Sequence, residues 1–195
     1  TVAAIAVAID NAIGIGDGEA DDRVFIPVVL PDGMEYIASL MAVWATGHAC
    51  VFLSTEFPWR RVEYAINHTR APLVIDEDFI REKVVAANNA RLCRRMTAVG
   101  RADTDRCALF YTSGSTGEPK GVLHSDKSFA GGVERFLTFN RIGGYKSFFG
   151  APPCFFVAVN DTLAAISSGL CAHFLTPDAK RDVLLLERYL ADHAI

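Results

Sequence analysis

Apolar residues alternate along the chain between two periodicities. Some segments place them three or four residues apart, which is the spacing of a helix with one buried face. Others hold them in short unbroken runs, which are typical of buried strands. The pattern predicts helices over 2–13, 34–46, 58–69, 78–89, 127–139, 162–168 and 182–193, and strands over 23–30, 49–53, 72–75, 107–111, 122–124, 147–151 and 170–175.

Strands and helices therefore follow one another in turn. Such alternation requires crossover connections, which are right-handed and place successive strands parallel. We expect an α/β fold, with a layered, largely parallel sheet and flanking helices. Pro27 conflicts with the strand over 23–30, because proline cannot donate a hydrogen bond to a central ladder. The chain contains no internal repeat and no low-complexity tract.

Composition excludes several classes of function. The chain has 195 residues, of which 51% are hydrophobic, so it can bury a core of its own. Its formal net charge of −4 and the lack of an extended basic stretch argue against nucleic acid as a partner. No apolar run reaches the ~18 residues that a membrane span needs. The apolar residues 1–9 could be part of a signal peptide, but they lack a basic flank, and we favour a helix.

The cysteines and histidines do not have the spacing of a metal site or a redox pair. Most of the cysteines lie inside apolar runs, which favours buried thiols in a reducing compartment. We therefore expect a cytoplasmic protein without a metal site of its own. The cysteines are Cys50, Cys93, Cys107, Cys154 and Cys171, and the histidines are His48, His68, His124, His173 and His193.

Residues 110–122, FYTSGSTGEPKGV, are the most informative segment. Glycines let backbone N–H groups approach an anion, hydroxyls donate to phosphate oxygens, and lysine adds a positive charge. The composition alone fits a flexible surface loop equally well. A Walker loop is excluded, because Lys120 is followed by Gly121 and not by Ser or Thr.

The order of residues in this segment resembles the signature loop of the adenylate-forming superfamily. That superfamily includes acyl-CoA synthetases, luciferases and the adenylation domains of nonribosomal peptide synthetases. Residues 40–64 and 71–75 are similar to the family's upstream segment, in which a helix ends at glycine and proline opens the next helix. Residues 163–175 resemble the helix, glycine and strand that line the acyl pocket. The resemblance covers nearly the whole chain.

The resemblance implies ATP-dependent activation of a small carboxylic acid as an acyl-adenylate, with Mg²⁺ carried by ATP. The acyl group would then pass to CoA or to a phosphopantetheine carrier protein. Lys120 is the candidate catalytic residue, which would neutralise the leaving pyrophosphate or hold the loop closed. We expect Glu118 to face solvent, and we favour a structural role for His124 over one near the substrate. The implied ATP phosphate-binding residues are Thr112, Ser113, Gly114, Ser115, Thr116, Gly117 and Lys120.

The resemblance also implies an acid substrate pocket at Phe156, Val157 and Asn160. Counting back from Gly169, Phe156 takes the position where amino-acid-activating members keep an Asp that pairs with the substrate ammonium group. Burying an ammonium group without a counter-charge costs roughly several kcal/mol. The expected substrate is therefore an aryl, acyl or keto acid without an α-ammonium group. Alternatively, Phe156 belongs to the core and the alignment is shifted by one residue. For Asp161, next to Asn160, we favour a role as cap of the helix over 162–168.

The family's later segments contact adenine, ribose and magnesium, and its C-terminal lid domain supplies a lysine. None of these segments has a counterpart before Ile195. We expect residues 1–195 to be a partial AMP-binding (adenylation) domain, truncated before the adenine and ribose motifs and the lid domain. Two alternatives are a non-catalytic nucleotide-binding or assembly module that retains the phosphate loop, and a structural domain with a degenerate loop, which the intact loop disfavours.

Overall fold

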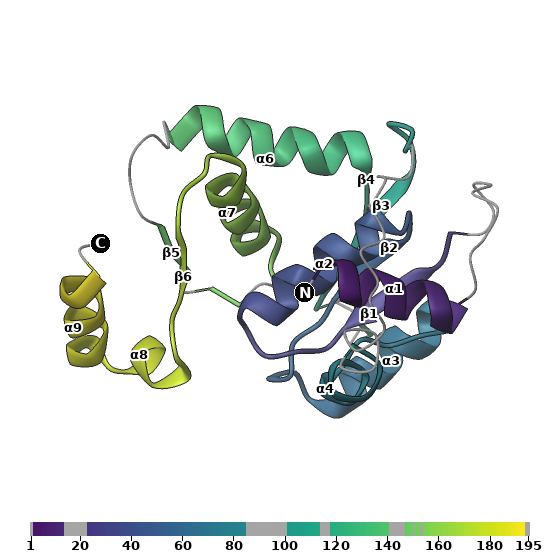
Figure 1. Ribbon diagram of the computed structural model, residues 1–195, viewed down its shortest axis with the longest axis horizontal. Helices are drawn as coiled ribbons and strands as arrows, with labels where there is room; N and C mark the ends of the chain where they lie inside the picture. The colour runs from purple at the N-terminus through teal and green to yellow at the C-terminus, as the bar shows by residue number, and fades with distance from the viewer. Residues whose placement is uncertain are drawn as a thin grey trace. The chain divides into compact units, whose positions relative to one another are not determined.

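The computed structural model describes residues 2–13, 23–84, 101–113, 118–140, 147–149, 151–152 and 154–193 (Figure 1). The chain forms two compact units, Thr1–Phe129 and Ala130–Ile195, which we call the first and the second unit. Each is described below by itself.

A four-stranded sheet forms the centre of the first unit. Its strands are β1 (Phe25–Val28), β2 (Ala49–Phe52), β3 (Arg106–Thr112) and β4 (Lys120–Ser125), in the order β1-β2-β3-β4. The pairs β1–β2 and β2–β3 are parallel, whereas β3 and β4 form an antiparallel hairpin. The expected sheet, largely parallel with flanking helices, is therefore confirmed.

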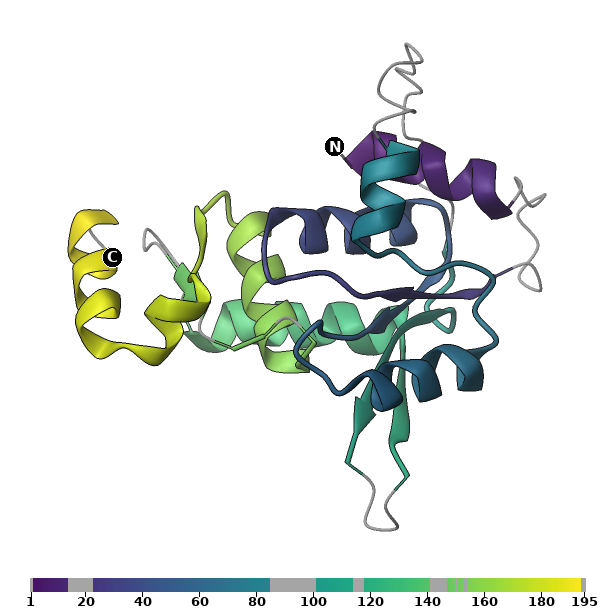
Figure 2. The same ribbon diagram turned by 90° about the horizontal axis from the view of Figure 1, so that it is seen from below.

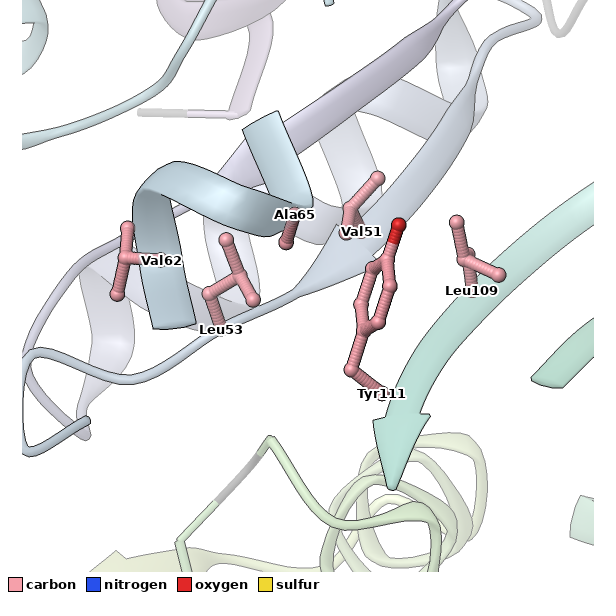
Figure 3. Close-up of a cluster of buried hydrophobic side chains, with 6 residues drawn as sticks. All are labelled: Val51, Leu53, Val62, Ala65, Leu109 and Tyr111. Atoms are coloured by element: carbon pink, nitrogen blue, oxygen red, sulfur yellow. The ribbon is translucent and has the colours of Figure 1, made fainter. Parts of the chain in front are cut away.

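Helices cover both faces of this sheet. Helices α2 (Met34–Ala45) and α3 (Trp59–Thr69) contact its strands, whereas α1 (Val2–Ile13) packs against α2 and against the π-helical segment Ile80–Val84, which continues the short α4 (Glu77–Phe79). Helix α6 (Asp126–Asn140) begins in this unit. Figure 2 shows α2 and α3 on opposite sides of the strands. Strand β2 is buried throughout and β3 is buried between its two exposed end residues, because both faces of the sheet are covered. The cluster under α3 consists of Val51, Leu53, Val62, Ala65, Leu109 and Tyr111 (Figure 3).

Pro27 fits its strand because β1 is the edge strand of the four-stranded sheet. The carbonyl of Pro27 accepts a hydrogen bond from the Ile75 amide at 2.9 Å. The proline nitrogen faces the same side, away from β2, so its missing N–H costs the β1–β2 ladder nothing. The predicted strand over 72–75 is wrong: Ile75 alone pairs, as an isolated bridge to Val28.

The second unit holds a two-stranded parallel sheet, β5 (Ser147–Phe149) and β6 (Ala172–Phe174), with helices α7 (Phe156–Ser167), α8 (Pro177–Arg181) and α9 (Val183–His193). Helix α8 was not predicted; the Thr176 hydroxyl caps it by accepting from the Ala179 amide at 3.2 Å.

Helix α7 corrects one expectation. It begins at Phe156, six residues before the predicted start at residue 162, so Asp161 lies inside the helix and does not cap it. Asp is a preferred capping residue, which made position 161 attractive as a boundary. The apolar residues before it extend the helix, because their burial outweighs the weak local preference of one Asp.

Candidate active site

The two ends of the predicted phosphate loop lie side by side at the loop end of the β3–β4 hairpin. Thr112 closes β3 and Lys120 opens β4, and the two residues are register partners. The Thr112 hydroxyl lies 3.4 Å from the Lys120 carbonyl oxygen, a long hydrogen bond. Gly114, Ser115, Thr116 and Gly117 lie outside the described residues, so their role stays a prediction.

The side chains at this end of the hairpin face solvent. Thr112, Ser113 and Lys120 are exposed, and Glu118 is exposed as expected. Within the described parts of the chain, the Lys120 ammonium group has no hydrogen bond or ion pair. Two hydroxyls and an unpaired ammonium group together suit a polyphosphate, whose oxygens accept hydrogen bonds and carry negative charge.

Tyr111 anchors the hairpin immediately before these exposed residues. Its side chain is 6% exposed, and its hydroxyl lies 2.7 Å from Nδ1 of His68 on α3. Burial, and then the neighbouring Tyr64, raise the pKa of Tyr111 to about 12. The hydroxyl therefore stays protonated at neutral pH, and the tautomer of His68 decides whether it donates to Nδ1 or accepts from it. No local pattern predicts the His68–Tyr111 pair, because 43 residues separate its members.

His124 lies within an aromatic cluster. Its ring stands edge-on to Phe110, with ring centroids 5.7 Å apart, and to Phe129, at 6.4 Å. Its Nδ1 lies 3.4 Å from the Ser128 hydroxyl. Burial lowers the pKa of His124, so the neutral ring is favoured. These contacts support the structural role that we favoured from the sequence.

Two of the three predicted acid-pocket residues share one face of α7. Phe156 and Asn160 are one helical turn apart, and both approach Gly132 of α6. A Cβ added at Gly132 would lie 3.0 Å from Cζ of Phe156 and 3.3 Å from Nδ2 of Asn160. Val157 points elsewhere and is 62% exposed, so the structure does not bring it together with the other two.

Asn160 is a buried polar residue with an unsatisfied atom. The residue is 5% exposed, and its Oδ1 has no hydrogen-bond partner among the described residues. Asp161, the next residue, also buries an unpaired Oδ1, and burial raises the pKa of its carboxyl group. Buried polar atoms are normally paired, so an orphaned amide oxygen beside a candidate binding face is consistent with a missing donor.

The sequence interpretation missed Gly132. The available signal was the pair Gly131–Gly132 inside a predicted helix, which is unfavourable without a packing reason. The structure supplies that reason at Gly132 alone, because a Cβ at Gly131 would meet nothing within 4 Å.

The described parts of the chain hold no cluster of three or more His, Cys, Asp or Glu side chains that could bind a metal ion. Across the same residues, no helix is both long and apolar enough to cross a membrane.

The model of one protein family, AMP-binding enzyme, matches residues 1–195. This match spans the strand, the hairpin and the α7 face described above. The chain therefore belongs to the AMP-binding enzyme family, as its resemblance to the adenylate-forming enzymes led us to expect.

A curated relative and two solved structures agree with this assignment. Tyrocidine synthase 2 of Brevibacillus parabrevis is 26% identical over 192 residues, which make up 93% of this chain and 5% of that protein. The N-terminal subdomain of Klebsiella oxytoca NpsA, solved with 3-hydroxyanthranilyl-AMSN, superposes with a TM-score of 0.73 at 18% identity, covering 97% of this chain and 48% of that one. The four-domain nonribosomal peptide synthetase holo-AB3403, solved with AMP and glycine, gives 0.75 at 20% identity, covering 97% of this chain and 14% of that one.

At these identities the two structures establish the shared fold. The chain spans 5% of tyrocidine synthase 2 and about half of the Klebsiella subdomain.

Proposed function

We propose that this chain supplies the phosphate-binding hairpin and one wall of the acid site of an ATP-dependent acid–AMP ligase. The observation that carries the proposal is the exposed Lys120, which lies opposite Thr112 at the loop end of the hairpin and has no hydrogen bond or ion pair with described residues. The chain that holds it belongs to the AMP-binding enzyme family. The acceptor of the activated acyl group would be the thiol of CoA or of a phosphopantetheine carrier protein. The adenine and ribose contacts and the lid lysine would come from a further part of the same enzyme.

In the proposed reaction, the substrate carboxylate attacks the α-phosphorus of ATP, an acyl-adenylate forms and pyrophosphate leaves. Thr112 and Ser113 would donate hydrogen bonds to phosphate oxygens. Lys120 would stabilise the negative charge that develops on the leaving pyrophosphate. Mg²⁺ bound to the ATP phosphates would supply further charge neutralisation. Gly114, Ser115, Thr116 and Gly117 complete the proposed phosphate-binding set.

We further propose that the acid lacks an α-ammonium group. Phe156 offers no counter-charge on the face of α7 that it shares with Asn160. Asp161 does not replace it, because five residues along a helix place it about 140° around the axis from Phe156. The solved relatives include complexes with 3-hydroxyanthranilyl-AMSN and with glycine, so this fold is compatible with both aryl and amino acids. The choice between them rests on Phe156.

The test is substrate-dependent exchange of pyrophosphate into ATP by the full-length gene product and by this chain. Two matched pairs of acids, 3-phenylpropanoate with phenylalanine and 4-methyl-2-oxopentanoate with leucine, differ at the α-carbon. We expect the acid without the ammonium group to be preferred in each pair. Phe156→Asp should move the preference toward the amino acids, because it restores the counter-charge. A wild-type preference for the amino acids would contradict the assigned substrate class.

A Lys120→Ala variant is the control for chemistry at the hairpin. Binding of ATP without exchange by the full-length product, with any of the acids, would favour the non-catalytic nucleotide-binding module instead.

We also propose a cytoplasmic location. Cys50, Cys107 and Cys154 are buried free thiols, and Cys171 is an exposed one, which suits a reducing compartment.

A further inference from the structure

Arg61 connects helix α3 to the end of strand β3. Its Nη2 donates a hydrogen bond of 2.8 Å to the carbonyl oxygen of Tyr111, fifty residues away in the sequence. The register with β2 ends at Phe52, which lies opposite Phe110, so Tyr111 has no partner in β2. The guanidinium group thus replaces the hydrogen bond that a longer β2 would have provided.

The position of the guanidinium group is itself fixed. Its Cζ lies 4.0 Å from the centroid of the Phe57 ring, which restrains the planar group by a cation–π contact. Arg61 has no carboxylate partner among the described residues, and its Nε is buried without a hydrogen-bond acceptor there. The net charge of this group is therefore not neutralised locally. A positive charge in this position favours a polyphosphate near the hairpin end.

The side chain of Tyr111 is held by the same helix. Its hydroxyl pairs with His68, and the His68 ring stacks on Tyr64 with the centroids 5.6 Å apart. Figure 3 shows the Tyr111 ring in the cluster between α3 and the strands. Helix α3 thus contacts both the backbone and the ring of the last buried residue before the loop.

Tyr111 also contacts the strand that leaves the loop. A Cβ added at Gly121 would lie 3.1 Å from Cδ1 of Leu109 and 3.7 Å from Cε1 of Tyr111. Gly121 directly follows Lys120, and Thr112 directly follows Tyr111. A shift of Tyr111 would therefore displace both ends of the loop together.

We infer that Arg61 is a positioning residue for ATP binding: by holding the Tyr111 carbonyl it fixes the separation and direction of Thr112 and Lys120. It acts through the hairpin and touches no phosphate. This inference rests on the proposed function, since it assigns a role within the same site. The inference predicts a selective effect: loss of Arg61 impairs binding of ATP and leaves binding of the acid unchanged.

The test compares Arg61→Gln and Arg61→Lys with the control Arg60→Gln. Arg60 is the adjacent residue on α3, is exposed and forms no side-chain hydrogen bond, ion pair or ring contact with described residues. Two readouts are collected on the full-length gene product. The first is hydrogen exchange of the amides over 109–123, and the second is KM for ATP and for the acid in pyrophosphate exchange.

We expect Arg61→Gln to accelerate amide exchange over 109–123 and to raise KM for ATP about tenfold, with KM for the acid changed less than about twofold. Arg61→Lys keeps the charge but loses the planar fork, so it should raise KM for ATP by about threefold. Arg60→Gln should match the wild type in both readouts.

Unchanged amide exchange in Arg61→Gln would overturn the positioning role, whatever the kinetics show. Faster exchange accompanied by equal rises in both KM values would assign Arg61 a general structural role and also overturn the inference. If the wild type neither exchanges pyrophosphate nor binds ATP, the proposed function fails. Any role of Arg61 in ATP binding then fails with it, while the amide-exchange result still decides whether Arg61 holds the hairpin.

Discussion

At the loop end of the β3–β4 hairpin, the carbonyl and hydroxyl groups of Tyr111 have hydrogen-bond partners. On α7, by contrast, two neighbouring polar residues bury side-chain oxygens that have no partner among the described residues. Tyr111 is bonded through its carbonyl to Arg61 and through its hydroxyl to His68. Oδ1 of Asn160 and Oδ1 of Asp161 have no donor among the described residues. In the first region the protein itself satisfies the polar groups of Tyr111, although Nε of Arg61 is buried without an acceptor among the described residues, and the ammonium group of Lys120 lies in solvent. The second region, on α7, keeps two buried oxygens that could still accept hydrogen bonds.

Under the proposed function, this difference would correspond to two kinds of recognition. A triphosphate presents the same charges in every reaction, so a rigid hairpin base with exposed donors can be built in advance. Recognition of one acid among many depends on polar atoms that only the correct ligand satisfies, because leaving them unpaired is costly. The predictions below test this comparison, beginning with the largest expected effect.

Lys120→Ala should reduce pyrophosphate exchange by about 100-fold without changing the melting temperature. The ammonium group is exposed and forms no hydrogen bond or ion pair with described residues, so its loss should remove charge stabilisation and little packing. Lys127→Ala is the matched control: this lysine is 77% exposed and pairs at 3.4 Å with Asp103, itself an exposed residue. A melting temperature that falls in Lys120→Ala and not in Lys127→Ala would show that Lys120 supports the hairpin itself.

Gly132→Ala should destabilise the protein by about 1–2 kcal/mol, because the new methyl group presses on Phe156 and Asn160. The matched control is Gly131→Ala, in which the methyl group meets no atom within 4 Å. That change should stabilise α6 by up to about 1 kcal/mol through helix propensity. Urea unfolding measures both. Equal effects from the two substitutions would contradict the close contact of Gly132 on α6 with Phe156 and Asn160 on α7.

Tyr111→Phe should cost about 1 kcal/mol in the free energy of unfolding. The ring stays in the cluster under α3, and only the hydrogen bond to His68 is lost. Nδ1 of His68 then loses its partner in β3, but His68 is an exposed residue, so this nitrogen can bond to water instead. A neutral or stabilising effect would indicate that this bond does not hold the hairpin, and would leave Arg61 as its main connection to α3.

Asp161→Asn should give the smallest effect and a characteristic dependence on pH. Burial raises the folded-state pKa of Asp161 above its ordinary value of 3.8. The unfolded state therefore ionises first as the pH rises, and the ionised carboxylate opposes folding at neutral pH. The substitution should raise the free energy of unfolding at pH 7, and this gain should shrink as the pH is lowered toward 3.8.

Glu187→Gln on the exposed surface of α9 is the control for Asp161→Asn, since it removes a carboxylate that is not buried. Unfolding curves at pH 7 and pH 4.5 for both variants are sufficient. A gain in Asp161→Asn that does not change with pH would mean that the carboxyl group is not responsible for it.

Much of the fold could be predicted from the sequence, because buried parallel strands and amphipathic helices differ in their periodicity. The strand over 107–111 and the helix over 2–13 illustrate this, since both are formed as β3 and α1. The strand over 72–75 failed, because a short apolar run is also compatible with a segment that pairs at one residue. The start of α7 was predicted wrongly, because Asp161 resembled a helix cap.

The contacts that organise the candidate site could not be predicted. Arg61 and Tyr111 are fifty residues apart, and no local pattern relates them. The choice of Gly132 over Gly131 depends on which side of α6 meets α7, a tertiary fact. The phosphate loop was predicted from its order of residues alone, its role stays a prediction, and 114–117 lie outside the described residues.

Pro27 has a consequence for the behaviour of this protein at high concentration. An edge strand with regularly spaced free N–H and C=O groups can recruit a strand from another molecule, which begins edge-to-edge aggregation. On β1 the outer carbonyl of residue 27 is already occupied by Ile75, and the nitrogen beside it has no hydrogen to offer. An incoming strand would find no continuous set of partners there. Pro27, the residue that conflicts with the strand pattern, therefore also disfavours edge-to-edge aggregation through β1.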